Sequence, residues 1–318
     1  MQRSWLELRI VSRRVEAEDV VALVLASPTG GDLPPFSAGA HIDVEATPQL
    51  VRQYSLCNNP HHRGHYEIAV LRDPASRGGS IAMHDGFREG DLIRVSEPRN
   101  HFALQPVKSE ALLVAGGIGV TPLLCMAERL GSLGAPFVMH YCTRTPERTA
   151  FRGRIAKAAF ADRVVFHHDD GPAEQRFDPM ALFAGAARDA DAYVCGPPAF
   201  IDWVQAAAGD AGFPKDRLHR EYFAATAAED EGGETPFQLR IASTGETIDV
   251  GARESAAAAL ARHGIEIPVS CEQGVCGTCV TRVIAGEPDH RDMLMIDTNE
   301  EFTPCCSRAL SPVLVLDL

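Results

Sequence analysis

The sequence predicts a multidomain protein with an antiparallel β-barrel, a doubly wound α/β domain and a small α+β domain. Three observations support this fold class. Short alternating strands fill the first hundred residues, strands and helices alternate after residue 111, and a cysteine-rich segment follows an acidic stretch near the C-terminus. The 318 residues suffice for two or three domains. We place these domains at 1–103, 104–224 and 236–318, with 225–235 as a linker.

The barrel is predicted from residues that alternate between apolar and polar, a period typical of half-buried strands. Leu6, Leu8 and Ile10 follow this pattern, and residues 20–25 form a compact apolar run. Breakers such as Pro34-Pro35 separate the runs, and no long helical period lies between them. This spacing predicts an antiparallel barrel or sandwich.

The α/β domain begins with the continuous apolar run 111–115, which is typical of a parallel strand buried on both faces. A glycine-rich turn follows, and apolar residues then recur at helical spacing from Leu123 to Leu130. Further strands are predicted at 137–141, 164–167 and 192–195, with helical stretches between them. This alternation predicts a doubly wound sheet.

The third domain follows an acidic, aperiodic tether at 224–236. Strands are predicted at 237–241 and 247–250. A helix is predicted from Ser255 to His263, with Ser255 as its N-cap and Gly264 ending it.

The cysteine loop after this helix has the spacing C-x4-C-x2-C, formed by Cys271, Cys276 and Cys279, with Cys305 after 25 more residues. Four thiolates in this arrangement are typical of a plant-type [2Fe–2S] cluster. A zinc knuckle or incidental buried thiols are the alternatives, but zinc ligands usually occur as two close pairs. Spacing alone does not choose between Cys305 and its neighbour Cys306.

Composition narrows the possible partners and compartment. The net charge of −13 disfavours nucleic acid and anionic membranes and suits a partner with a basic docking face. The sequence contains no run of 18 apolar residues, so we predict no membrane span. Residues 1–15 do not resemble a secretory signal. We therefore expect a cytoplasmic protein whose cysteines are thiols or metal ligands.

A glycine-rich turn at 116–122, GGIGVTP, lies where the first buried strand becomes a helix. Thr121 is expected to cap the helix and Pro122 to occupy its first helical position. Exposed N–H groups and the helix dipole would favour a diphosphate there. A second loop at 194–198 follows another strand, and such loops at the carboxyl ends of neighbouring strands bind ligands in open α/β sheets.

The barrel contains a candidate flavin segment, Arg52-Gln-Tyr54-Ser55-Leu56. Tyr54 can lie flat against an isoalloxazine ring, Arg52 can pair with a phosphate and Ser55 can reach the flavin edge. The glycine turn at 77–80, RGGS, is a second phosphate-type site. Alone, the first segment would be read as an ordinary structural strand.

Taken together, the motifs RQYS, RGGS, PRNHF, GGIGVTP, CGPP and CEQGVCGTC with CCSRA cover nearly the whole chain. Their order resembles that of the phthalate dioxygenase reductase and vanillate demethylase reductase family, within the ferredoxin–NADP reductase superfamily. The resemblance implies a flavin-binding barrel, an NAD-binding α/β domain and a plant-type ferredoxin (β-grasp) domain. It assigns Cys305 as the fourth cluster ligand, because the family's ligand precedes a small residue and then Ser-Arg-Ala.

The resemblance also implies a function. The chain would be the NADH-dependent reductase that passes electrons through FMN and [2Fe–2S] to a Rieske-type oxygenase, either an aromatic-ring dioxygenase or an O-demethylase. A monomer is expected. Ser55 near flavin N5, Cys195 beside the nicotinamide and Phe223 at the flavin face are the expected catalytic residues.

The resemblance and the motifs together give two sets of cofactor-binding residues. The expected flavin set is Arg52, Tyr54, Ser55, Leu56, Val70, Arg72, Arg77, Gly78, Gly79, Ser80 and Phe223. The expected dinucleotide set is Gly116, Gly117, Gly119, Val120, Thr121, Pro122, Thr143, Arg144, Cys195, Gly196 and Pro197.

Three alternatives stay open. FAD could replace FMN, because the superfamily holds either flavin. NADPH could replace NADH. Binding its 2′-phosphate would need a cluster of basic residues, however, and the sequence offers one nearby arginine, Arg144. The chain could also be a stand-alone NADH:acceptor reductase or a non-catalytic electron-transfer subunit. The cluster domain argues against the first of these functions, and the cysteine spacing argues against the second.

Overall fold

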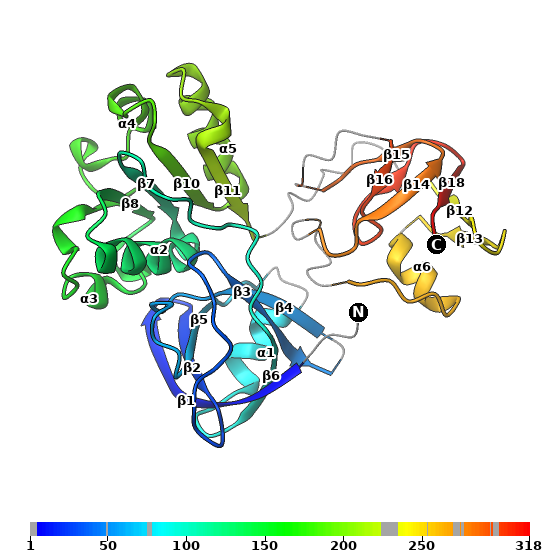
Figure 1. The fold of residues 1–318 in the computed structure, drawn as a ribbon, viewed down its shortest axis with the longest axis horizontal. Coiled ribbons are helices and arrows are strands. Elements are labelled where there is room, and N and C mark those ends of the chain that lie inside the picture. The colour runs from blue at the N-terminus through cyan, green and yellow to red at the C-terminus, as the bar shows by residue number, and fades with distance from the viewer. Residues whose placement is uncertain are drawn as a thin grey trace. The chain divides into compact units, whose positions relative to one another are not determined.

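The computed structural model describes residues 5–48, 50–74, 78–223, 235–252, 254–269, 274, 277–292, 294 and 299–318. The chain divides into two compact units, Gln2–Glu221 and Tyr222–Leu318 (Figure 1). The expected linker falls almost entirely outside the described residues. In the described part of the chain, no helix combines the length and the apolar character needed to cross a membrane.

The first unit begins with a six-stranded antiparallel sheet in the order β4-β3-β6-β1-β2-β5. Leu56, just after β4, bridges Ile68 of β5, so the two ends of this order meet and the sheet closes. Leu8 and Ile10 are buried in its core, as their alternation predicts. The elements are β1 (Trp5–Ala17), β2 (Val20–Ala26), β3 (His41–Thr47), β4 (Leu50–Ser55), β5 (Tyr66–Leu71), α1 (Gly79–Gly86) and β6 (Leu92–Ser96).

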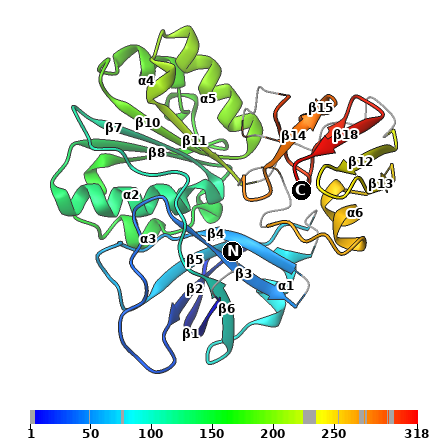
Figure 2. The ribbon, with the colours of Figure 1, turned by 45° about the vertical axis from the view of Figure 1, so that its right-hand side comes forward.

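A five-stranded sheet in the order β11-β10-β7-β8-β9 follows in the same unit. Strands β10, β7, β8 and β9 are parallel, and Figure 2 shows α2 on one face of the sheet and α4 and α5 on the other. The elements are β7 (Ala111–Gly116), η1 (Gly117–Gly119), α2 (Val120–Leu133), β8 (Phe137–Thr143), η2 (Pro146–Arg148), α3 (Arg152–Ile155), η3 (Ala161–Arg163), β9 (Val164–His168), η4 (Ala173–Gln175), α4 (Pro179–Gly185), β10 (Asp191–Gly196), α5 (Pro198–Asp210), η5 (Lys215–Arg217) and β11 (Leu218–Tyr222).

This strand order creates a topological switch point at the carboxyl ends of the parallel strands. Strand β7 lies between β8 and β10, so the connections that leave β7 and β10 diverge at their carboxyl ends. Open α/β sheets bind ligands at such a switch point. Both glycine loops predicted from the sequence lie there, at the ends of β7 and β10.

The second unit packs a helix on a five-stranded mixed sheet in the order β13-β12-β18-β14-β16. Ser255 caps α6 by accepting from the N–H of Ala258, as predicted. Together with the barrel and the parallel sheet, this unit confirms the predicted fold class. Its elements are β12 (Phe237–Ile241), β13 (Thr247–Val250), α6 (Ala256–Arg262), β14 (Thr281–Ala285), β15 (Pro288–Asp289), β16 (Glu301–Phe302), β17 (Arg308–Ala309) and β18 (Val313–Leu316).

Candidate functional site

The first glycine turn leads from β7 through η1 into α2. Gly117 has a φ of +55°, a conformation that glycine adopts at no steric cost. A side chain at Gly119 would overlap the carbonyl group of Cys195, so the turn lies directly against the second loop. Backbone N–H groups at the start of α2 remain suited to an anion, because a helix N-terminus carries partial positive charge.

Two sequence expectations for this turn are wrong. Thr121 does not cap α2, because the helix already begins at Val120 and Gly119 is its N-cap. The Thr121 hydroxyl instead donates to the carbonyl oxygen of Ile118 at 3.0 Å. Pro122 is not the first helical residue either, because Val120 and Thr121 precede it, but it lies in the first turn, where its missing N–H costs nothing.

The second loop, Cys195-Gly196-Pro197, joins β10 to α5. Cys195 pairs in register with Ala115 of β7, so both loops leave the sheet at the same level. A Cβ on Gly196 would lie 3.0 Å from Cα of Gly116, which shows how closely the two loops pack. Cys195 is fully buried, and burial, followed by the nearby Glu221 carboxyl, raises the pKa of its thiol well above the usual value. It is therefore a neutral thiol.

Residues after β8 complete this edge of the sheet. Gly116 is paired with Cys142, so Thr143 and Arg144 follow at the same edge as the first glycine turn. The Thr143 hydroxyl lies in a local network, 2.8 Å from the Thr149 hydroxyl and 2.9 Å from Nδ1 of His168. That network fixes the end of β8.

The flavin segment lies on β4, with its end at Ser55. Tyr54 packs against the barrel core, and burial raises the pKa of its phenol above the usual value. The Arg52 side chain runs beside the start of α1, because a Cβ on Gly79 would come within 2.7 Å of its Cγ and Nε. One corner of the barrel thus combines a guanidinium with a helix N-terminus, a combination that fits a phosphate.

The remaining expected flavin residues have mixed surroundings. The side chains of Leu56 and Val70 are fully buried in the barrel core. Arg72 makes a two-pronged ion pair with Asp85 at 2.7 and 3.0 Å. Gly78 has a φ of +89° and is the N-cap of α1, as expected of a glycine turn that opens a helix. Arg77 lies outside the described residues.

Glu221, near the end of β11, links the two halves of the first unit. The Ser55 hydroxyl donates to Oε2 of Glu221 at 3.2 Å, across 166 residues of sequence. Burial raises the pKa of Glu221 to about 8, and the Ser55 hydrogen bond counteracts part of this shift. Ser55, Glu221 and Cys195 therefore form one cluster of neutral polar groups at neutral pH. The sequence motifs did not mark Glu221 as a site residue, although an acid near the end of the last strand of an α/β sheet is a usable signal.

Two candidate cluster ligands lie together in the second unit. Sγ of Cys279 and Sγ of Cys305 are 3.3 Å apart, and both cysteines are buried and not joined by a disulfide. Two adjacent thiols of this kind fit neighbouring ligands of one iron–sulfur cluster. Cys271 and Cys276 lie outside the described residues, and Phe223 is described at the start of this unit, directly after β11.

Cys306 has a different environment from Cys305. Its Sγ lies 3.5 Å from Oγ1 of Thr303 and 3.9 Å from Oγ of Ser307. Gly274 packs against the same sulfur, since a Cβ there would come within 2.5 Å of it. Gly274 also has a φ of +69°, so both its backbone conformation and its close packing require glycine.

Comparison with known proteins is consistent with this arrangement. Residues 239–310 match the 2Fe-2S iron-sulfur cluster binding domain family. The vanillate O-demethylase oxidoreductase of Pseudomonas sp. (strain HR199 / DSM 7063) is 48% identical over 319 residues, covering 98% of this chain and 100% of that protein. The phthalate dioxygenase reductase of Burkholderia cepacia is 40% identical over 317 residues, covering 99% and 98% of the two chains.

A solved structure matches along the same length. It is described as phthalate dioxygenase reductase, a modular structure for electron transfer from pyridine nucleotides to [2Fe-2S], and it has a TM-score of 0.81 at 40% identity over 99% of this chain and 98% of that one. The chain therefore belongs to the phthalate dioxygenase reductase family of iron–sulfur flavoproteins, the NADH-dependent reductase components that pass electrons through FMN and a [2Fe–2S] cluster to an oxygenase.

Proposed function

We propose that Ser55, Glu221 and Cys195 form the site at which NADH reduces the flavin. The observation that carries this proposal is the Ser55–Glu221 hydrogen bond, which brings the end of the flavin strand to the edge of the nucleotide sheet. When bound, the flavin would supply the chemistry that couples NADH, a two-electron donor, to a cluster that accepts single electrons. The three residues orient the reacting groups and add no net charge at neutral pH.

The surrounding residues have separate binding roles in this proposal. The turn at 116–121 and the start of α2 hold the dinucleotide phosphates, with the loop at 195–197 beside the nicotinamide. Arg52 and the N-terminus of α1 hold the flavin phosphate. Phe223 covers the flavin, as the family resemblance implies.

In the second unit, we propose that four thiolates hold the cluster. Cys279 and Cys305 supply two of them, which their 3.3 Å sulfur separation supports, and Cys271 and Cys276 supply the others. Cys306 is not a ligand in this proposal, because the family resemblance assigns Cys305 and the sulfur of Cys305 lies beside that of Cys279.

We further propose that the oxygenase partner is of the Rieske type and that the chain acts as a monomer in the cytoplasm. Three relatives that are 43% to 48% identical are named vanillate O-demethylase oxidoreductases, which favours an O-demethylase over a ring dioxygenase. Residues 236–318 contain 12 acidic and 6 basic residues, so a basic face on the oxygenase would complement this unit.

An anaerobic titration with NADH tests the proposed function. We expect the flavin bands to bleach and the cluster absorbance to fall next, with NADPH much less effective. Adding the purified oxygenase should reoxidise the chain, and added salt should slow that step because it screens the charges. Protein that is yellow but shows no paramagnetic signal after dithionite would contradict the proposed route.

The raised pKa of Glu221 predicts how flavin reduction depends on pH. Because the folded pKa of about 8 exceeds the usual value, the carboxyl is neutral at pH 7 and ionises above pH 8. An added negative charge beside the flavin strand would oppose electron transfer to the flavin, so the rate should fall by roughly tenfold above that pKa. Rapid-mixing kinetics across pH would measure this fall.

A matched variant isolates the carboxyl. Glu221→Gln keeps the shape of the neutral side chain, so its rate should stay near the wild-type plateau and lose the alkaline fall. The raised pKa of Glu221 also makes folding stability depend on pH, because the folded protein keeps a proton that the unfolded chain releases. The contribution of Glu221 to stability therefore decreases between its unfolded pKa and pH 8 and is constant above that range. An alkaline fall that persists in Glu221→Gln would assign the titration to another group.

A further inference from the structure

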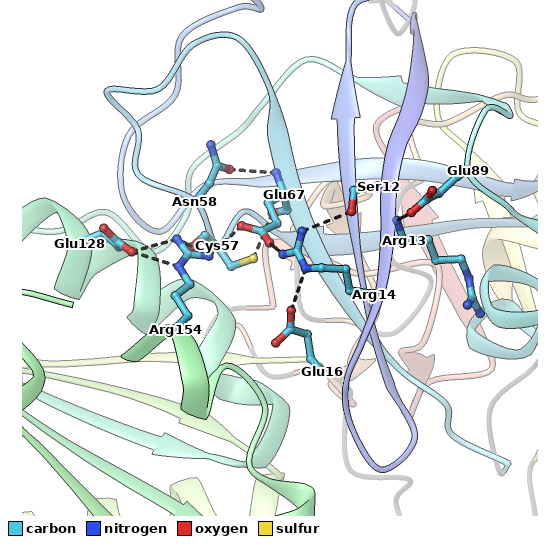
Figure 3. A network of polar contacts seen from close by, with 10 residues as sticks. All are labelled: Ser12, Arg13, Arg14, Glu16, Cys57, Asn58, Glu67, Glu89, Glu128 and Arg154. Atoms are coloured by element: carbon cyan, nitrogen blue, oxygen red, sulfur yellow. Dashed lines mark hydrogen bonds and ion pairs between the residues drawn. The ribbon is translucent and has the colours of Figure 1, made fainter. Parts of the chain in front are cut away.

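An ion-pair network joins the barrel to the α/β domain (Figure 3). Its centre is Arg154 of α3, which donates through Nη1 to Oε2 of Glu67 on β5 at 2.7 Å. The same guanidinium donates to Oε1 of Glu128 on α2 at 3.1 and 2.9 Å. Its Nη2 also reaches the carbonyl oxygen of Cys57 at 3.3 Å. One side chain therefore contacts β5, α2 and the segment that follows β4, and so joins two domains.

Glu67 is almost completely buried, with 5% of its surface exposed, and it depends on these partners. Its other carboxylate oxygen accepts from Nη2 of Arg14 at 2.5 Å. Its backbone N–H donates to the Asn58 side chain, and its carbonyl accepts from the N–H of Cys57. Removing one partner of a buried ion pair leaves an uncompensated charge. The ion pairs of the buried Glu67 therefore hold their geometry much more firmly than an ion pair on the surface does.

Two of the three partners of Arg154, Cys57 and Glu128, are close in sequence to parts of the proposed site. Cys57 lies two residues after Ser55, and Leu56 between them bridges β5. Glu128 lies on α2, the helix whose first residues follow the dinucleotide turn. Arg154 thus fixes the end of the flavin strand relative to the helix that carries the nucleotide site.

A second ion pair connects the same two domains and provides a comparison. Arg148 pairs with Glu18, in the turn after β1, at 3.0 and 2.8 Å. The side chains of this pair are 37% and 52% exposed, whereas those of Arg154 and Glu67 are 27% and 6% exposed. Exposed pairs are screened by water and salt and contribute little. The difference in burial indicates that the Arg154–Glu67 pair restrains the two domains, whereas the Arg148–Glu18 pair contributes little.

We propose that Arg154 is a positioning residue for flavin reduction: it holds the nucleotide-binding helix in register with the flavin strand. This inference rests on the proposed reduction site at Ser55, Glu221 and Cys195. Arg154 does not touch the reacting groups. It acts through Glu67, Glu128 and the Cys57 carbonyl.

Rapid mixing of cofactor-loaded Arg154→Gln with NADH at low temperature tests the proposal. The limiting rate of flavin reduction should fall by about tenfold, because small displacements of reacting groups are costly, while the NADH concentration for half-maximal rate changes little. Arg154→Lys keeps the charge but loses the planar fork, so it should recover only part of the rate. Arg148→Gln is the matched control and should behave like wild type.

Hydrogen–deuterium exchange gives a readout that does not depend on turnover. The amides of Cys57 and Glu67 should exchange faster in Arg154→Gln than in wild type or Arg148→Gln, with or without NADH. Should Arg154→Gln lose its flavin, Glu67→Gln serves as the second variant and should show the same lowered rate.

The outcomes separate this inference from the proposed function. If NADH does not reduce the flavin of wild-type protein, the proposed function itself fails. If wild type is reduced and both Arg154→Gln and Glu67→Gln keep its limiting rate within about twofold, only the positioning role is overturned. A lower melting temperature with an unchanged rate would likewise show a merely structural ion pair.

Discussion

Replacing Cys305 with alanine should abolish the [2Fe–2S] signature, while replacing Cys306 should leave it intact. The sulfur of Cys305 lies 3.3 Å from that of Cys279, whereas the sulfur of Cys306 contacts the Thr303 hydroxyl. Loss of a supporting contact to a metal ligand already costs 10- to 100-fold in affinity, so loss of a ligand should cost more than about 100-fold. Visible absorbance and the paramagnetic signal of the reduced protein measure this difference.

The Cys305→Ala variant should also divide the electron route. NADH should still reduce the flavin, because the first unit contains that site, but electron delivery to cytochrome c should fall to the background of flavin alone. Cys306→Ala is the matched control, since it removes a neighbouring sulfur from the same turn. Bleaching of the cluster in Cys306→Ala alone would reverse the assignment of the fourth ligand.

Gly119→Ala should cause the largest loss on the nucleotide side. The new Cβ would overlap the carbonyl carbon and oxygen of Cys195 and the N–H of Gly196, all of them backbone atoms that cannot rotate away. One glycine loop must therefore move, and a displacement of about 1 Å in such a site costs roughly 100-fold in rate. Flavin reduction by NADH should slow accordingly, while the flavin and cluster spectra of the resting protein stay unchanged.

Gly209→Ala provides the control for that substitution. Gly209 lies in α5, and a Cβ there would meet nothing within 4 Å. Its reduction rate should match wild type, and its stability should equal or exceed that of wild type, since alanine favours a helix. Wild-type NADH kinetics in Gly119→Ala would show that the two loops are not packed as tightly as the backbone indicates.

Local patterns predicted most of the secondary structure. Strands β12 and β13 have the bounds expected from alternation alone, and Ser255 caps α6 because its side chain needs only a neighbouring N–H. Thr121 shows where local reasoning fails. A 3-10 turn precedes α2, so the helix starts before Thr121. The Thr121 hydroxyl therefore donates to the carbonyl oxygen of Ile118 instead of capping the helix.

Features of the site that depend on long-range contacts could not be predicted in the same way. Ser55 and Glu221 are 166 residues apart, and Glu67 and Arg154 are 87 residues apart, so their pairing follows from the packing of two domains. The expected flavin residues Leu56 and Val70 also show this limit. Leu56 ends the flavin motif and Val70 lies on β5, and the register of the barrel directs both side chains into the core.

The close packing of the two glycine loops has a consequence for nucleotide binding. Gly116, Gly119 and Gly196 leave no space for either loop to shift independently, so the two loops behave as a single rigid body. The conformational entropy of these segments was lost when the chain folded, and the dinucleotide does not have to order them on arrival. Such preorganisation favours affinity without additional contacts, so two short loops can suffice for the proposed dinucleotide site.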